Sequence, residues 1–193
     1  GQAEVGFIGR VLLNAFNAWE YGWECNREDL KANSAQIFDS YLKNGFTEAG
    51  FLKESVNYGK NFEDPVHSIR RQSEGLYAIF HFLAYEKEKG RKHPEWEQRL
   101  KNMLNMFLQL QSADGSFPRK FRDDFSIVDK SGGSTPSATL PLVMGYKYFK
   151  GKRYLARARR SADYLQTELM SRAEHLSSTL DANCEDKEAS LYA

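Results

Sequence analysis

Four acidic side chains crowd the C-terminal end of the chain, at Asp181, Glu185, Asp186 and Glu188. Two carboxylates held on either side of a glycosidic bond can supply the acid and the base or nucleophile that break it. Crowding of like charges would also raise the pKa of one carboxyl, as an acid catalyst needs. The first three are therefore catalytic candidates. The alternative is capping, because acidic residues interact favourably with helix N-termini.

Aromatic and acidic residues alternate in the segment Trp19-Glu20-Tyr21-Gly22-Trp23-Glu24. Flat rings can stack on the apolar face of a sugar ring, while carboxylates accept hydrogen bonds from its hydroxyl groups. Trp19 and Trp23 are therefore substrate-binding candidates. The alternative is that these rings close the core at the end of a helix.

Two long connections have little helical periodicity, over residues 45–70 and 111–133. Such connections are often binding loops. In the first, His67 is either a ligand-binding or catalytic residue, or a structural histidine. In the second, Asp114-Gly115 predicts a tight turn and Phe117 offers a ring, so Asp114 and Phe117 are substrate-binding candidates. The mixed charge of the second connection also suits a solvated loop.

The elements that position these residues are helices, because apolar residues recur at steps of three and four. The pattern predicts helices over 3–18 and 27–43, a short helix near 48–56, and two further hairpins over 71–110 and 134–169.

Glycine and proline mark the ends of these helices. Gly90 and Gly151 interrupt the two later hairpins, and Pro94 and Pro136 suit first helical turns. Ser134 or Thr135 is the expected N-cap before Pro136.

The later hairpins resemble each other, and a third copy begins where Glu188–Ala193 echoes Glu74–Ala78. A hairpin that recurs along the chain is typical of stacked or circular helical arrays. We therefore expect residues 1–193 to form a single α-hairpin domain that is part of a larger one.

Composition excludes several classes of function. The formal charge of +1 gives no basic footprint for nucleic acid. No apolar run approaches the length of a membrane span, and no secretory signal pattern precedes the first helix. Cys25 and Cys184 belong to no metal-spaced cluster and are either two free thiols or one long-range disulfide. We therefore expect no metal, cofactor, membrane or nucleic acid.

The hairpins resemble the six-hairpin glycosidases and related (α/α)-toroid enzymes. The resemblance rests on Gln111-x-x-Asp-Gly-Ser-Phe117 after an outer helix and on the turn Gly145–Leu155 between an inner and an outer helix. It covers residues 70–193 well and the first hairpin loosely. It implies an all-α fold made of about half of a six-hairpin (α/α) toroid, an incomplete ring. It also implies that the missing remainder of the chain completes the ring.

The same resemblance implies a carbohydrate substrate, a secreted or periplasmic location, and a pocket at one end of the inner helices. Our first hypothesis is a glycoside hydrolase that acts on oligo- or polysaccharides through loop carboxylates. The alternative is a non-catalytic helical-repeat module that binds a glycan or a protein. A terpene-cyclase-like role is a distant third, because Asp123-Asp124 is no D-D-x-x-D motif.

Overall fold

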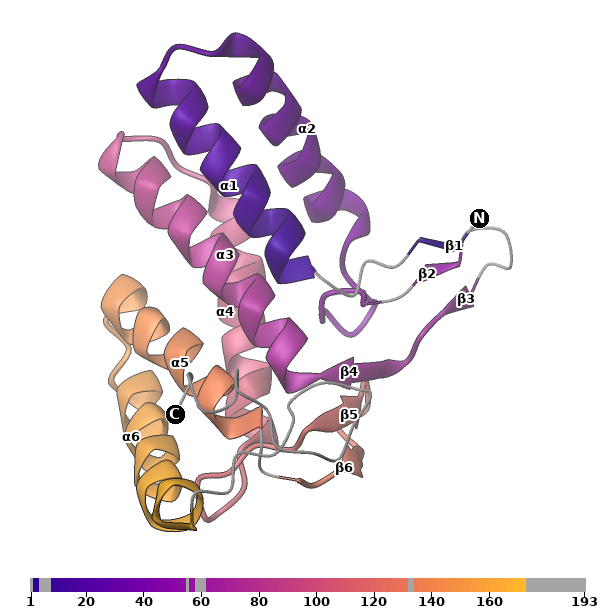
Figure 1. Cartoon of the computed structure of the whole chain (residues 1–193), viewed down its shortest axis with the longest axis vertical. Coiled ribbons are helices and arrows are strands. Elements are labelled where there is room, and N and C mark those ends of the chain that lie inside the picture. The colour runs from indigo at the N-terminus through magenta and orange to yellow at the C-terminus, as the bar shows by residue number, and fades with distance from the viewer. Residues whose placement is uncertain (1, 4–7, 55, 58–61, 132–133, 173–193) are drawn as a thin grey trace.

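The computed structural model describes residues 2–3, 8–54, 56–57, 62–131 and 134–172, and these residues confirm the predicted all-α class (Figure 1). They form six α-helices arranged as three antiparallel hairpins. The helices are α1 (Ile8–Glu24), α2 (Glu28–Asn44), α3 (Ile69–Glu88), α4 (Pro94–Leu110), α5 (Thr135–Phe149) and α6 (Lys152–Tyr164). A π-helical segment, Leu165–Leu169, and a short 3₁₀ turn, Met170–Arg172, continue α6.

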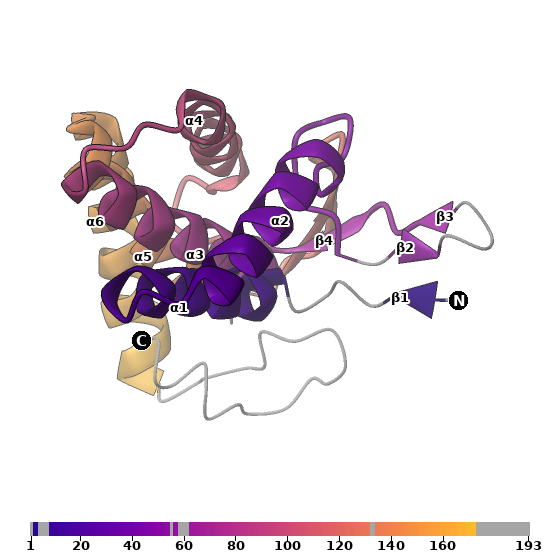
Figure 2. The same cartoon turned by 90° about the horizontal axis from the view of Figure 1, so that it is seen from above.

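Helices α1, α3 and α5 form the inner layer, because α3 packs against both of the others. Helix α2 packs on α1, α4 packs on α3 and α5, and α6 packs on α5 from the outside. Seen from above, α4 lies on the far side of α3 from α1 (Figure 2), and α3 packs against both α1 and α5. The array is therefore an incomplete ring of hairpins.

The two ends of the array differ in the length of their connections. Turns of two to five residues join the helices of each hairpin at one end. The long connections 45–68 and 111–134 lie at the other end, where α1, α3 and α5 begin (Figure 1). We call these the turn end and the loop end.

Short strands organise the loop end. Strands β1 (Gln2–Ala3), β2 (Val56–Asn57) and β3 (Phe62–Glu63) form one antiparallel sheet. Strands β4 (Val66–Ser68), β5 (Lys120–Arg122) and β6 (Ile127–Asp129) form another. Because β4 pairs with β5, and His67 lies opposite Phe121, the two long connections are joined to each other.

The apolar periodicity of the central hairpin corresponds to the core. Its buried residues include Leu76, Ile79, Leu83, Leu100, Met103, Leu104 and Phe107. Each such side chain contributes roughly 1.5–3 kcal/mol when it is fully removed from water. The central hairpin therefore contributes a large part of the buried core.

Two local predictions were wrong. The first helix continues past residue 18 to Glu24, so the aromatic and acidic cluster is helical. Residues 46–52 form a tight reversal instead of a short helix, with a bridge from Phe46 to Leu52 and a φ of +99° at Gly50. Gly151 lies between α5 and α6 as predicted, where it is the N-cap of α6, and the left-handed residue before it is Lys150, with a φ of 58°. Gly90 has a φ of +77° and ends its helix as predicted.

The Gln111–Phe117 motif fastens the second hairpin to the third. The Gln111 side-chain nitrogen lies 2.9 Å from the Arg157 carbonyl oxygen and 2.8 Å from the Ser161 hydroxyl. Gly115 has a φ of +98°, and a Cβ there would lie 2.2 Å from the Arg160 carbonyl oxygen. The motif is therefore explained by packing between hairpins.

Candidate functional site

The two candidate tryptophans lie at the turn end, away from the long connections. The Trp19 indole donates a hydrogen bond of 2.7 Å to Glu86, and the Arg91 guanidinium lies 4.2 Å from the centre of the Trp23 ring. These contacts join α1 to the α3–α4 turn. The structure therefore does not bring Trp19 and Trp23 together with the candidates in the loops.

Glu86 is the centre of this cluster and is 1 % exposed. It accepts hydrogen bonds from Trp19, Arg91 and His93, the last at 2.7 Å. Burial opposes its ionisation, but the hydrogen bonds from Arg91, His93 and Trp19 outweigh burial and hold the pKa of Glu86 below its usual value. Because Glu86 is ionised and surrounded by donors, it serves to close the turn end.

The candidates of the second long connection have local structural roles. Asp114 accepts hydrogen bonds from the backbone N–H and hydroxyl of Ser116, at 2.9 and 2.7 Å, and these lower its pKa. Phe117 is fully buried and packs against Phe107. Its predicted stacking on a sugar is not seen, because no face of the ring reaches the surface.

The three catalytic candidates and one of the two cysteines lie outside the described residues. These are Asp181, Glu185 and Asp186, together with Cys184, so their predicted roles stay predictions. Cys25 is exposed at the turn end. Among the described residues, no group of histidine, cysteine and acidic side chains is placed to hold a metal ion, and no helix is long and apolar enough to cross a membrane.

A groove of about 390 Å³ lies across the first turns of all three inner helices. Its lining is contributed by α1 (Gly9, Arg10, Leu13), α3 (Arg70, Ser73, Glu74, Tyr77) and α5 (Ser137, Leu140, Pro141). These positions place the groove on the inner layer and near the loop end. It is a candidate ligand site, because side chains from three segments far apart in sequence converge there.

Glu74 is the one carboxylate among the described residues that line this groove. The Arg70 side-chain Nε donates a hydrogen bond of 2.9 Å to it. Gly9 lets α1 approach at this point, because a Cβ there would lie 2.2 Å from the Glu74 Cβ. The close approach of α1 and the bond from Arg70 hold Glu74 in place.

Tyr77, which lines the groove, begins a row of ring contacts between α3 and α1. The rings of Tyr77 and His81 meet edge-on with centroids 4.4 Å apart, and Phe16 lies 5.8 Å beyond His81. Burial lowers the pKa of His81, against the opposing charge of Glu20. The Tyr77 phenol and the His81 imidazole therefore follow Glu74 along the same face of α3, and burial favours the neutral form of the imidazole.

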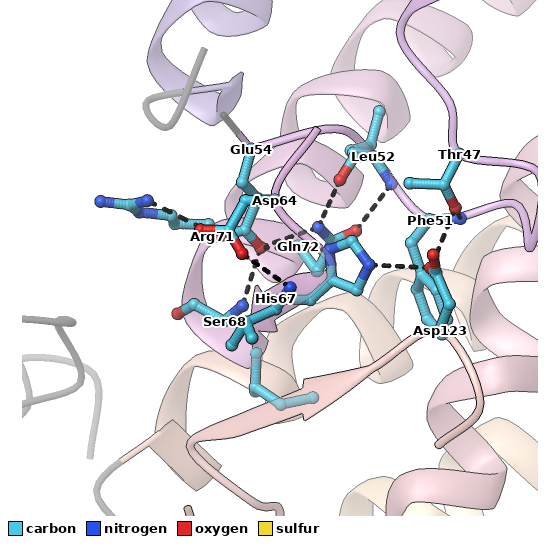
Figure 3. Close-up of polar contacts among 12 residues, drawn as sticks. Thr47, Phe51, Leu52, Glu54, Asp64, His67, Ser68, Arg71, Gln72 and Asp123 are labelled. Carbon is cyan, nitrogen blue, oxygen red and sulfur yellow. Dashed lines mark hydrogen bonds and ion pairs between the residues drawn. The ribbon is translucent and has the colours of Figure 1, made fainter. Parts of the chain in front are cut away.

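His67 belongs to a buried polar network behind the start of α3 (Figure 3). Its side chain is fully buried, and its Nε2 lies 2.8 Å from Asp123 Oδ1. Asp123 also accepts a hydrogen bond of 3.1 Å from the Thr47 hydroxyl. The rings of Phe51 and Phe121 pack on the imidazole, at 5.1 and 5.4 Å. His67 is therefore paired with Asp123, and the sequence alone did not indicate this partner.

Glu54 lies on the other side of His67 and is 2 % exposed. Its Oε1 accepts hydrogen bonds from the Ser68 backbone N–H at 2.8 Å and the Gln72 amide at 2.9 Å. Burial raises the pKa of Glu54 to about 7, although these hydrogen bonds and the Arg71 cation oppose the shift. Burial thus favours the neutral form of the Glu54 carboxyl.

Sequence reasoning did not select Glu54, Glu74 or Tyr77 as site residues. The sequence does draw attention to Glu74 and Tyr77, since both belong to the segment Glu74–Ala78, which Glu188–Ala193 resembles. Glu54 carries none, because nothing near it in the sequence indicates burial. Its environment is set by the pairing of two distant connections.

Comparison with known proteins identifies the architecture. No protein-family model matches the chain. A cellobiose 2-epimerase from Bacillus thermoamylovorans superimposes with a TM-score of 0.66 at 20% identity, over 82% of this chain and 40% of that one. A possible member of the GH105 family from Salmonella enterica superimposes with a TM-score of 0.72 at 13% identity, over 97% and 50%. An unsaturated glucuronyl hydrolase from a Bacillus species, responsible for the degradation of glycosaminoglycan, gives 0.66 at 12% identity, over 87% and 47%.

The chain has the fold of an (α/α) toroid. The predicted resemblance and the predicted incomplete ring are both confirmed at the level of fold. The chain spans between 40% and 50% of the length of these toroid enzymes. It therefore supplies about half of such a ring, and the groove lies on the inner layer of that half.

Proposed function

We propose that this half-toroid is part of a carbohydrate-processing enzyme and that its groove holds a saccharide. The observation that carries the proposal is the convergence of the three inner helices on one groove, in which Glu74 and Tyr77 lie one helical turn apart. The fold supports the proposal, since the enzymes that share it include an epimerase and hydrolases of carbohydrates.

The groove has the mixed character that a sugar requires. A pyranose presents apolar C–H faces and a rim of hydroxyl groups. Tyr77, Leu13 and Leu140 offer apolar surface for the faces, and the Glu74 carboxylate can accept hydrogen bonds from the hydroxyls. Because Arg70 orients that carboxylate, its hydrogen bonds to hydroxyls would favour one pose of the sugar.

For the reaction, we propose glycoside hydrolysis, with Asp181, Glu185 and Asp186 as candidate carboxylates. The hydrolases with this fold support that choice. Epimerisation or isomerisation is the second candidate, because a cellobiose 2-epimerase and a D-mannose isomerase have the same fold. A non-catalytic glycan-binding module is the third. These alternatives give different products from one substrate, so a single assay separates them.

The test incubates the full-length protein with cellobiose, mannose and an unsaturated glucuronyl disaccharide, and identifies products by chromatography and NMR. Smaller sugars would indicate hydrolysis, and an isomer of unchanged mass would indicate epimerisation or isomerisation. In parallel, binding of the same sugars is followed by chemical shifts of the ¹⁵N-labelled chain.

We expect Tyr77→Ala to weaken saccharide binding about tenfold or more, because the ring supplies much of the apolar contact. Glu74→Gln should weaken it as well. Glu95→Gln, on the exposed surface of α4, is the matched control and should have no effect. Shift changes confined to residues outside the groove, or equal affinity for all three variants, would contradict the assignment of the groove.

A further inference from the structure

We propose that Glu54 and His67 form a proton-dependent latch that holds the loop end together. The latch joins three segments: residues 45–54, the β4–α3 junction and the turn between β5 and β6. The inference is independent of the proposed function, because it concerns residues behind the groove and needs no ligand.

Two buried atoms of this pair lack hydrogen-bond partners among the described residues. They are Glu54 Oε2 and His67 Nδ1. The two side chains face each other, with Nδ1 4.0 Å from Glu54 Oε1, and they are 2 % and 0 % exposed. An unpaired buried polar atom costs about 1–3 kcal/mol, and the Arg71 cation, 3.6 Å from Glu54 Oε2, offsets part of this cost when the carboxylate is ionised.

The hydrogen bond to Asp123 fixes how the pair can hold a proton. Asp123 Oδ1 is an acceptor, so His67 Nε2 carries a hydrogen. A single further proton can then reside either on Glu54, with neutral His67, or on His67 Nδ1, with ionised Glu54. In both cases the pair is electrically neutral, and loss of this proton leaves a net negative charge in a buried site.

The charged groups around the pair make that loss unfavourable for the folded state. Asp123 lies beside His67, and Asp64 opposes ionisation of Glu54. Arg71, 3.6 Å from Glu54 Oε2, is the cation that faces the pair. Ser68 and Gln72 contribute neutral donors. Without its proton, the pair therefore adds a third negative charge beside Asp64 and Asp123, and among the described residues Arg71 is the cation that opposes this charge.

The same residues hold the three segments in place. Gln72 exchanges two hydrogen bonds with the Leu52 backbone, at 2.9 and 2.7 Å, and Glu54 accepts one from the Ser68 N–H. Thr47 binds Asp123, which binds His67. Because Ser68 and Gln72 flank Arg70 on α3, the latch also supports one edge of the groove.

The sign of the effect follows from the raised pKa of Glu54. A carboxyl whose folded pKa, about 7, exceeds its usual value of 4.5 stabilises the folded state most below pH 4.5. That stabilisation is lost as the pH rises through 7. The opening equilibrium of the loop end should then increase on the order of 50-fold between pH 5 and pH 8.

Hydrogen exchange measured by NMR tests the latch in the whole chain. The amides of Leu52 and Ser68 report on it directly, since both hydrogen-bond within it. After correction for intrinsic exchange, we expect their protection to fall on the order of 50-fold from pH 5 to pH 8. Glu54→Gln should abolish this pH dependence, whereas Glu95→Gln should retain it. Unchanged pH dependence in Glu54→Gln would overturn the proposal.

A second measurement needs no substitution and so avoids any folding defect. The side-chain carboxyl carbon of Glu54 can be followed by ¹³C NMR as the pH is raised. A midpoint near 7 is expected for the Glu54 carboxyl, because burial raises its pKa. A midpoint near 4.5 would also overturn the proposal.

Discussion

Replacing Glu86 with alanine should strongly destabilise the turn end. The carboxylate is 1 % exposed and receives hydrogen bonds from Trp19, Arg91 and His93. Alanine leaves these donors facing a small cavity. Removal of one partner from a buried charged pair typically costs 3–5 kcal/mol. Arg91 and His93 are 30% and 31% exposed, so water reaches them in part and we expect about 3 kcal/mol.

Urea unfolding followed by tryptophan fluorescence measures this loss. With a denaturant slope of about 2–3 kcal/mol/M, the midpoint should fall by about 1–1.5 M. Glu95→Ala, which removes an exposed carboxylate from α4, should change stability by less than about 0.5 kcal/mol. A double-mutant cycle with Arg91→Ala should give a coupling energy of at least about 1 kcal/mol.

The same carboxylate predicts a pH dependence of opposite sign to that of Glu54. Because the folded pKa of Glu86 is lowered, its contribution to stability is present above the usual value of 4.5 and is lost as the pH falls through the folded value. Acid should therefore destabilise the wild type more than Glu86→Ala. A loss below about 1 kcal/mol at pH 7, or an unchanged acid response in the variant, would refute this account of the cluster.

Three further substitutions test the packing between helices. Gly9→Ala should cost about 1–3 kcal/mol in urea unfolding, because the new Cβ would meet Glu74 at 2.2 Å, and stability equal to wild type would mean that α1 and α3 are farther apart. Gln111→Leu should lower the free energy of unfolding by about 1–3 kcal/mol, since the Ser161 hydroxyl loses a hydrogen-bond partner. An unchanged stability would mean that Gln111 does not hold the two hairpins together. Phe117→Ala should cost about 3–5 kcal/mol by calorimetry while leaving saccharide affinity unchanged, and lost affinity with intact stability would restore it as a binding residue.

The helices could be predicted from sequence because their information is local. The steps of three and four through Leu76 and Leu83 correspond to buried positions on one face of α3. Gly90 and Pro94 mark the break and restart that the structure shows. Such signals need only a few neighbouring residues, so one sequence was sufficient to assign the hairpins.

The buried network around His67 could not be predicted in the same way, because its residues meet through long-range pairing. His67 and Asp123 are 56 residues apart and are joined through the register of β4 and β5. These strands are short and have little periodicity, so the sequence did not indicate that they pair. The positions of Trp19 and Trp23 also depend on the fold: the direction of α1 places them at the turn end, away from the loop candidates, and their binding role stays a prediction.

Gln111 gives the array a property that a simple stack of hairpins would lack. In repeat proteins, cooperativity depends on how strongly each unit is coupled to its neighbours. The Gln111 side chain reaches across a hairpin boundary to Arg157 and Ser161, so fraying of α6 exposes polar groups that belong to the preceding unit. A force applied to α6 would therefore be transmitted to the central hairpin, and the last two hairpins should yield together in a single mechanical event.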